Sequence, residues 1–371
     1  MKDTESVLYS RIREIGGLYT HAMDAARKRQ AELAKPPGSL GRLEDLAVQL
    51  AGMTGRVKNT LDRKELLVFC ADNGVVAEGV SSAPQSVTLA QTINLTRGKT
   101  GAAVIAGQFG CHVRVCDVGV HTDIREPAVI NRKIGYGTNN IAQTAAMTRK
   151  EAVEAILVGM ELACSAAADG AKVIGVGEMG IGNTTTSSAV LTVLTDAAVS
   201  DVTGRGGGIT DESYQKKIRV IQTAIEVNRP DKHDPIDVLA KVGGFDLCAM
   251  CGAFLGAALM RVPAVIDGFI SVVAALCAVR LCTAAREYLI PSHESYEIGY
   301  RLAIRELGLS PLFDLGMRLG EGSGCPIAMM MLDAACAVMN RMATFEEAEI
   351  SDDYLEDIRR TDAFTVERRS T

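Results

Sequence analysis

Four short apolar runs, rich in Val, Ile and Leu, recur along the chain, and each is followed by a turn that contains glycine. The runs are Leu66–Ala71, Val113–Val118, Val173–Val176 and Ala264–Ile266. Between them lie stretches whose apolar residues recur at the spacing of a helix. These stretches are Gly101–Phe109, Lys150–Asp169, Thr185–Val199, Tyr214–Val227 and Asp246–Met260. Strands that alternate with helices in this way predict an α/β fold, in which helices flank a parallel sheet.

Both ends of the chain carry helical patterns instead. Apolar residues recur at helical spacing over residues 1–35, up to the break Lys35-Pro36-Pro37-Gly38-Ser39. Ser39 is placed to cap a second helix there. Residues 299–345 are again helical in pattern, with one interruption at Gly320-Glu321-Gly322-Ser323-Gly324. The sequence therefore predicts helical ends around an α/β centre.

The composition is that of a globular protein and excludes several classes of function. The 371 residues are 47% hydrophobic and 23% charged, with a formal net charge of −6, so disorder is excluded as the main state. No block of Lys and Arg is present to neutralise phosphates, which argues against a nucleic-acid partner. The longest apolar stretches, Leu247–Met260 and Gly268–Val279, are too short to span a bilayer. Because the first residues show no apolar signal segment, a cytoplasmic protein is expected.

Cysteine and histidine usage predicts no metal site. The ten cysteines are expected to be reduced thiols rather than a disulfide framework. Cys248 and Cys251 form a single CxxC pair without a second pair at zinc spacing, and we interpret them as small apolar residues on a buried helix face. The five histidines form no cluster.

Two glycine-rich turns are candidates for binding an anion. Gly177-Glu178-Met179-Gly180-Ile181-Gly182-Asn183-Thr184 follows a predicted strand and enters a helix. Glycines there let a ligand approach the backbone, and a helix N-terminus favours negative charge; a tight turn with a polar helix cap is the alternative. Gly204–Gly208 is a weaker signal, and Lys217 on the next helix reads by its position alone as a surface lysine.

Three carboxylates stand beside glycines or directly after strands. Glu321 lies among glycines, where a flat ligand can pack close to it, and an apolar surrounding would suit it to general-base work. A loop that ends a helix, with an incidental Glu, is the alternative. Asp72 and Asp267 directly follow predicted strands, and each is interpreted equally well as a helix cap or as a ligand contact.

Taken together, several segments resemble one enzyme family. They occur in order between about residue 10 and about residue 345: Lys35–Glu44, Ala71–Val75, Thr96–Gly101, Gly177–Thr185, Val242–Asp246, Ile290–His293 and Met317–Gly324. In these motifs the chain is similar to the nicotinate-nucleotide–dimethylbenzimidazole phosphoribosyltransferases, which prepare the lower ligand of cobamides, the B12 group.

The resemblance implies an architecture. Members have a Rossmann-like large domain with a parallel sheet and a small helical domain built from both chain ends. On this basis we expect residues 1–60 and 311–371 to form the small domain, the latter carrying Glu321, and residues 61–310 to form the large one. The family also implies a homodimer.

The resemblance implies a reaction as well. A base attacks C1′ of nicotinate mononucleotide, nicotinate leaves, and the configuration at C1′ inverts from β to α. Nicotinate leaves from a cationic pyridinium and needs little acid assistance, whereas the attacking azole must lose a proton. No cofactor is implied, and the partners are small-molecule substrates.

Roles for individual residues follow from the matched motifs. Glu321 matches the catalytic base, and Glu178 matches a second catalytic carboxylate that steadies positive charge on the ribose or holds the acceptor. The acceptor-binding positions are Ala83, Gln91, Met179 and Leu319. The nucleotide- and phosphate-binding positions are Gly180, Asn183, Thr184, Gly206, Gly207, Gly208 and Lys217.

The sequence departs from the family pattern at three positions in or near the acceptor site. Asn73 replaces a His that is common in the ADHGV turn, Ala83 stands where some relatives carry Ser, and Met179 stands where Leu is frequent, while Gln91 keeps the expected amide. The departures leave the phosphate turns unchanged, so they bear on the acceptor and not on the nucleotide.

Three interpretations of function remain open at this point. Dimethylbenzimidazole is the default acceptor. A member that accepts phenol or p-cresol is the second, because Ala83 and Met179 make the acceptor pocket less polar; such a protein can pair with a paralogue as a hetero-oligomer. The third is a non-catalytic subunit, against which the intact Glu321 and glycine turns argue.

Overall fold

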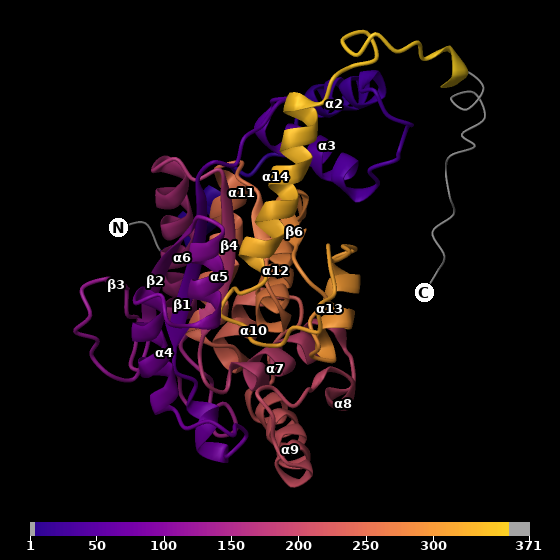
Figure 1. Ribbon diagram of the computed structural model, residues 1–371. Coiled ribbons are helices and arrows are strands. Elements are labelled where there is room, and N and C mark those ends of the chain that lie inside the picture. The colour runs from indigo at the N-terminus through magenta and orange to yellow at the C-terminus, as the bar shows by residue number, and fades with distance from the viewer. Residues whose placement is uncertain (1–3, 356–371) are drawn as a thin grey trace. The chain divides into compact units, whose positions relative to one another are not determined.

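The computed structural model describes residues 4–355, in which six parallel strands form one sheet in the order β3-β2-β1-β4-β5-β6 (Figure 1). The strands are β1 (Lys64–Ala71), β2 (Cys111–Gly119), β3 (Val129–Asn131), β4 (Val173–Met179), β5 (Ala264–Ile266) and β6 (Leu289–Pro291). This is the strand order of a Rossmann-like sheet, in which the chain runs outward from the centre in both directions. The predicted fold class is therefore confirmed.

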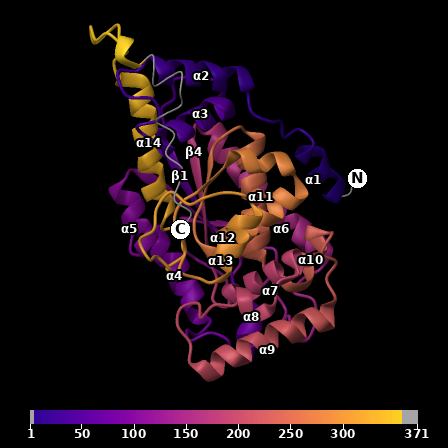
Figure 2. The ribbon, with the colours of Figure 1, turned by 90° about the vertical axis from the view of Figure 1, so that its right-hand side faces the viewer.

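Helices connect the strands and cover both faces of the sheet. They are α4 (Ser86–Thr96), α5 (Gly101–Gln108), α6 (Arg149–Ala168), α7 (Asn183–Thr195), α8 (Val199–Val202), α9 (Asp211–Asn228), α10 (Pro235–Val242), α11 (Phe245–Leu259), α12 (Phe269–Leu281) and α13 (Gly299–Glu306). Figure 2 shows α4 and α5 on one side of β1 and β4, with α6 and α11 on the other. Cys248 and Cys251 are free, fully buried thiols on α11, as expected for a buried helix face. None of the described helices is long and apolar enough to cross a membrane.

The chain divides into two compact units, and their bounds differ from the expected domains. The first unit holds residues up to Gly16 together with Arg63–Met329, and the second holds Gly17–Asp62 with the residues from Met330 on. Residues 4–16 join the first unit because Glu5 forms an ion pair with Arg149 on α6. Residues 311–329 join it because the Glu321 loop is hydrogen-bonded to Asp267 after β5. Glu321 thus lies in the α/β unit, not with the small helical one.

The helical unit contains α2 (Thr20–Glu32), α3 (Arg42–Thr54) and most of α14 (Cys325–Arg341). The Ser39 prediction was wrong: α3 begins at Arg42, preceded by Gly41 with a positive φ of 52°, and its N-cap makes no side-chain hydrogen bond. The expected single helix over residues 1–35 is split into α1 (Thr4–Ile12) and α2, because a turn at Arg13 and Glu14 is followed by an irregular segment over residues 15–19. Residues 307–324 are not helical, so the interruption before α14 is longer than the glycine loop alone. The parts of the expected small domain at residues 1–3 and 356–371 lie outside the described residues.

Candidate active site

One cavity in the α/β unit, of about 270 Å³, is lined by residues that follow the carboxyl ends of several strands. Parallel sheets bind ligands at this edge, and β1 and β4 form the point where the chain order reverses. Eleven of the thirteen residues predicted for the site line the cavity: Ala83, Gln91, Glu178, Met179, Gly180, Asn183, Thr184, Gly206, Gly207, Leu319 and Glu321. The structure thus brings together segments that are far apart in the sequence.

Glu321 lies at one end of this cavity and is held by two hydrogen bonds. Its Oε1 accepts from Gln91 Nε2 at 3.3 Å, and its Oε2 accepts from the backbone N–H of Ala102 at 3.2 Å. Ala102 is in the first turn of α5, where the helix dipole favours a negative charge. Asn94 donates to Gln91 Oε1 at 3.0 Å and so fixes the orientation of the Gln91 amide. The carboxylate of Glu321 is therefore buried, and its two hydrogen bonds fix its orientation.

Asp267 holds the loop that carries Glu321 through two hydrogen bonds. The Asp267 carboxylate accepts from the N–H of Gly322 at 3.1 Å and from the N–H of Gly324 at 2.7 Å. Glu321 itself has a positive φ of 63°, a conformation that costs a non-glycine residue energy and is kept only where the surroundings impose it. Asp267 also lines the cavity. The helix that follows it, α12, has no side-chain cap, and contact of Asp267 with a ligand stays a prediction.

Glu178 is the penultimate residue of β4 and belongs to a cluster of buried carboxylates. Asn183 Nδ2 donates to Glu178 Oε2 and, at 3.0 Å, to Asp246 Oδ2. Burial raises the pKa of Glu178 to about 8, and the neighbouring charges of Asp246 and Asp267 add to this rise. Burial also raises the pKa of Asp246 to about 6. Carboxylates this close cannot all ionise easily, so the cluster holds a proton near neutral pH.

Lys217 does not line the cavity, but it hydrogen-bonds Thr184, which does. The residue is buried on α9, and its Nζ donates to Thr184 Oγ1 at 2.8 Å and to the carbonyl oxygen of Gly204 at 3.1 Å. Burial lowers its pKa to about 8, an effect that the charge of Glu297 opposes. Lys217 is therefore not the surface lysine that its position alone indicated. Gly208 also lies outside this cavity and lines a neighbouring one with Gly204 and Arg205.

Asp72 and Asn73 lie outside the cavity. Asp72 Oδ2 accepts from the N–H of His121 at 2.8 Å, so it secures the loop after β2 and neither caps a helix nor lines the site. Asn73 is fully buried behind Gly180, whose Cβ, if present, would lie 3.1 Å from Asn73 Nδ2. The replacement of His by Asn therefore lies behind the residues that line the cavity and does not change the lining itself.

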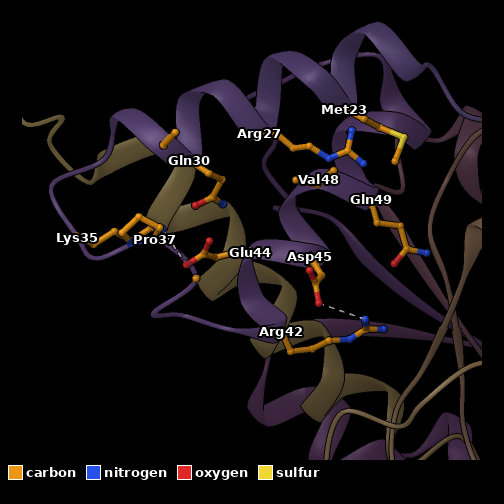
Figure 3. A pocket seen from close by; sticks show the side chains of 12 residues that line it. Met23, Arg27, Gln30, Lys35, Pro37, Arg42, Glu44, Asp45, Val48 and Gln49 are labelled. Atoms are coloured by element: carbon orange, nitrogen blue, oxygen red, sulfur yellow. Dashed lines mark hydrogen bonds and ion pairs between the residues drawn. The ribbon is translucent and has the colours of Figure 1, made fainter. Parts of the chain in front are cut away.

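Among the residues described, a larger cavity of about 510 Å³ lies within the helical unit and is lined by none of the predicted site residues (Figure 3). Lys35 and Glu44 of the first family motif meet there in a partly buried ion pair of 2.7 Å. Glu44 also accepts from the N–H of Leu40 at 3.0 Å. In this unit the motif secures the turn between α2 and α3.

Comparison with known proteins agrees with this geometry. A sequence model of a phosphoribosyltransferase family matches residues 15–350. The chain belongs to this family. A nicotinate-nucleotide–dimethylbenzimidazole phosphoribosyltransferase of Clostridium perfringens (strain ATCC 13124) is 51% identical over 96% of this chain and 98% of its own length. The enzyme of that name from Acetivibrio thermocellus is 47% identical over 92% of this chain and 97% of its own.

Solved structures give the same assignment. The crystal structure of CobT from Thermus thermophilus superposes with a TM-score of 0.86 at 41% identity, covering 90% of this chain and 99% of that one. The protein is accordingly an enzyme of the pentosyl-transferring class, a phosphoribosyltransferase.

Several further residues of this phosphoribosyltransferase line the cavity without having been assigned to it from the sequence. They follow β5 and β6 or precede Glu321: Phe269, Ile270, Ser271, His293, Ser295, Glu297 and Arg318. His293 and Arg318 belong to motifs that carried the family resemblance, so those motifs could have indicated them. Ser295 and Glu297 are single polar residues, and no spacing distinguishes them in the sequence. Asp246 does not line the cavity, but it belongs to the matched segment Val242–Asp246, which could have indicated it.

Proposed function

We propose that this enzyme transfers the phosphoribosyl group of nicotinate mononucleotide to an aromatic base, with 5,6-dimethylbenzimidazole as the default acceptor. The observation that carries the proposal is a fixed carboxylate, Glu321, in one cavity with two glycine turns. An assay of nicotinate mononucleotide with benzimidazoles, purines and phenols tests it. Formation of an α-ribotide and nicotinate is expected, and binding of the nucleotide without turnover would instead support a non-catalytic subunit.

In the proposed reaction Glu321 takes the proton. The acceptor nitrogen forms a bond to C1′ from the face opposite to nicotinate, which inverts the configuration. The bond from C1′ to nicotinate breaks, and its electron pair neutralises the pyridinium nitrogen. The N–H proton of the acceptor passes to a carboxylate oxygen of Glu321, which the hydrogen bonds from Gln91 and Ala102 hold in place. Positioning of this kind supplies much of the rate enhancement in such transfers.

Glu178 supports the reaction by changing its charge. With a pKa of about 8 it is protonated in the free enzyme near neutral pH. Binding of the cationic nucleotide favours the ionised carboxylate, so the proton of Glu178 passes to solvent before the bond at C1′ breaks. Glu178 then stabilises the transition state more than the bound substrate, which is the condition for faster chemistry.

The acceptor end of the cavity favours a second candidate. Ala83 and Met179 both line it, and neither offers a strong hydrogen bond to the second ring nitrogen of a benzimidazole. A phenol, with one hydroxyl, suits such a wall. In this case an O-linked α-riboside phosphate is formed, with a paralogous subunit as a potential partner. Offering a benzimidazole and a phenol in competition to the purified chain distinguishes the two acceptors. The homodimer stays a prediction, for light scattering to test.

Replacing Ala83 with Ser is expected to shift acceptor preference toward benzimidazoles. The new hydroxyl can hydrogen-bond the second ring nitrogen, and one such bond changes preference by about three- to tenfold. The measurement is the ratio of kcat/KM for benzimidazole and for phenol, with Ala90→Ser on the exposed face of α4 as the control. An unchanged ratio would remove Ala83 from the acceptor contacts.

Replacing Lys217 with Met, which keeps much of the volume but removes the charge, is expected to raise KM for nicotinate mononucleotide by about tenfold or more while kcat changes little. An ammonium has three N–H donors, of which Thr184 and Gly204 take two. Because the pKa of Lys217 is about 8, wild-type KM should rise as the pH increases through 8, and the variant should lose that dependence. Lys216→Met, on the exposed face of α9, is the control. A KM that matches wild type at every pH would show that Lys217 does not serve the phosphate.

A further inference from the structure

Glu297 is a buried carboxylate in the nucleotide half of the cavity, and the reaction described above does not use it. The residue lines the cavity, is only 9% exposed, and lies on the loop between β6 and α13. Its Oε2 is buried and has no hydrogen-bond partner. A buried acceptor without a donor costs free energy, so a residue of this kind calls for a ligand that supplies the donor.

The surroundings of Glu297 place it at the glycine turn after α8. Its Oε2 lies so close to Gly204 that any Cβ at that position would collide with it. The positive charges of Lys217 on α9 and of Arg318 in the loop before Glu321 act on the carboxylate, and the backbone N–H of Gly206 donates to it. Among residues 4–355 no ion pair joins Glu297 to either of them. Burial raises the pKa of Glu297, and the positive charge of Lys217 opposes this rise.

The chemistry of the proposed donor substrate limits what Glu297 can bind. In nicotinate mononucleotide the ring carboxylate and the phosphate accept hydrogen bonds, because the second phosphate pKa is about 6. The pyridinium nitrogen carries no proton. The ribose hydroxyls are the groups that donate, and carboxylates recognise ribose hydroxyls in other nucleotide-binding folds.

We infer that Glu297 accepts a hydrogen bond from a ribose hydroxyl of the nucleotide donor. The inference rests on the proposed function, since it takes nicotinate mononucleotide as the donor. Glu297 is then a specificity residue that distinguishes ribonucleotides from deoxyribonucleotides. Gly204 is required beside it, because a side chain there would displace the carboxylate.

Two other roles for Glu297 make different predictions. If Glu297 acted only as a counter-charge that keeps Lys217 protonated, its loss would weaken the binding of every phosphate-bearing nucleotide by the same factor. As a protonated group that donates to the phosphate, it would likewise not distinguish ribose from deoxyribose. Comparing donors that differ in a single hydroxyl therefore separates these roles.

The test measures Kd by calorimetry for nicotinate mononucleotide and its 2′-deoxy and 3′-deoxy analogues. Wild type is expected to bind one deoxy analogue about tenfold to a hundredfold more weakly, as for a hydrogen bond to a charged group. Glu297→Ala should weaken the binding of nicotinate mononucleotide by a similar factor and abolish the difference in Kd between it and that deoxy analogue. Glu297→Gln, which keeps an acceptor oxygen, should restore part of it. Glu294→Ala, three residues earlier, removes a carboxylate that pairs with the exposed Arg301 outside this cavity and should change neither value.

The results separate the inference from the proposed function. If Glu297→Ala and Glu297→Gln weaken all three nucleotides equally, the hydroxyl contact is wrong and a counter-charge or phosphate role replaces it. Binding without turnover in wild type would contradict the transfer reaction, while the ratio of Kd values would still decide the role of Glu297. A wild type that binds none of the three nucleotides would overturn both. Circular dichroism and thermal melting confirm that each variant is folded.

Discussion

Replacing Glu321 with Gln is expected to lower kcat by about 10²- to 10⁴-fold, the usual contribution of a general base. Gln is close in shape to Glu and can still accept the hydrogen bond from Ala102, but it cannot take the proton of the acceptor. Nucleotide binding should therefore stay within a few-fold of wild type. Steady-state kinetics with the natural acceptor, together with calorimetry of nicotinate mononucleotide, measures both effects.

The loss should depend on the acceptor and on pH. A phenol ionises more readily than the N–H of a neutral benzimidazole, so rising pH should partly rescue the Gln variant with phenol and much less with benzimidazole. A variant that keeps more than about a tenth of wild-type kcat would contradict the base assignment. Glu178, which shares the cavity and has a pKa of about 8, would then be the candidate proton acceptor.

Replacing Gly177 with Ala is expected to lower kcat by about 100-fold, because a displacement of about 1 Å in an active site can cost that much. A Cβ at Gly177 in β4 would lie 2.6 Å from the backbone N and Cα of Gly322 and 2.7 Å from the carbonyl carbon of Glu321. These are backbone atoms of the Glu321 loop, and the hydrogen bonds to Asp267 prevent the loop from simply rotating away. The measurement is kcat beside the thermal unfolding midpoint Tm.

Gly107→Ala on α5 is the matched control. Nothing lies within 4 Å of a Cβ at Gly107, and Gly to Ala in a helix favours folding slightly. This variant should keep its kcat. If Gly177→Ala keeps kcat and Tm near wild type, the close packing of β4 against the loop does not position Glu321.

The central part of the fold could be predicted from the sequence, whereas its edges could not. The runs that became β1, β2, β4 and β5 are apolar and rich in β-branched residues, and each precedes a glycine turn. Strands β3, β5 and β6 have three residues each, so length does not separate them. Strand β5 is directly followed by Asp267-Gly268, whereas no glycine directly follows the edge strands β3 and β6. Helix α12 is buried almost throughout, so it shows no alternation of polar and apolar faces. The second helix was expected to start at Ser39, because residue type alone does not reveal that Gly41 turns the chain.

For the site, the sequence indicated which segments contain the candidate functional residues, but not which contacts between elements hold those residues in place. The glycine turns and Glu321 stand out because glycine is costly unless a close approach requires it. The contacts of Asp267 with Gly322 and Gly324, and of Asn183 with Glu178 and Asp246, join separate elements and have no signature in local spacing. Glu178 was expected in a turn, but β4 extends to Met179, so this carboxylate is held by the sheet.

The hydrogen bond between Gln91 and Glu321 joins residues that are 230 positions apart in the chain. Closing so long a loop lowers the entropy of the chain before the contact can stabilise it, and topologies with such contacts fold slowly. During synthesis, strands β1 to β6 and both glycine turns leave the ribosome before Glu321 does. Glu321, the proposed proton acceptor, is therefore the last part of the site to be put in place. A nascent or truncated chain that ends before residue 321 contains the nucleotide turns but cannot carry out the proposed transfer.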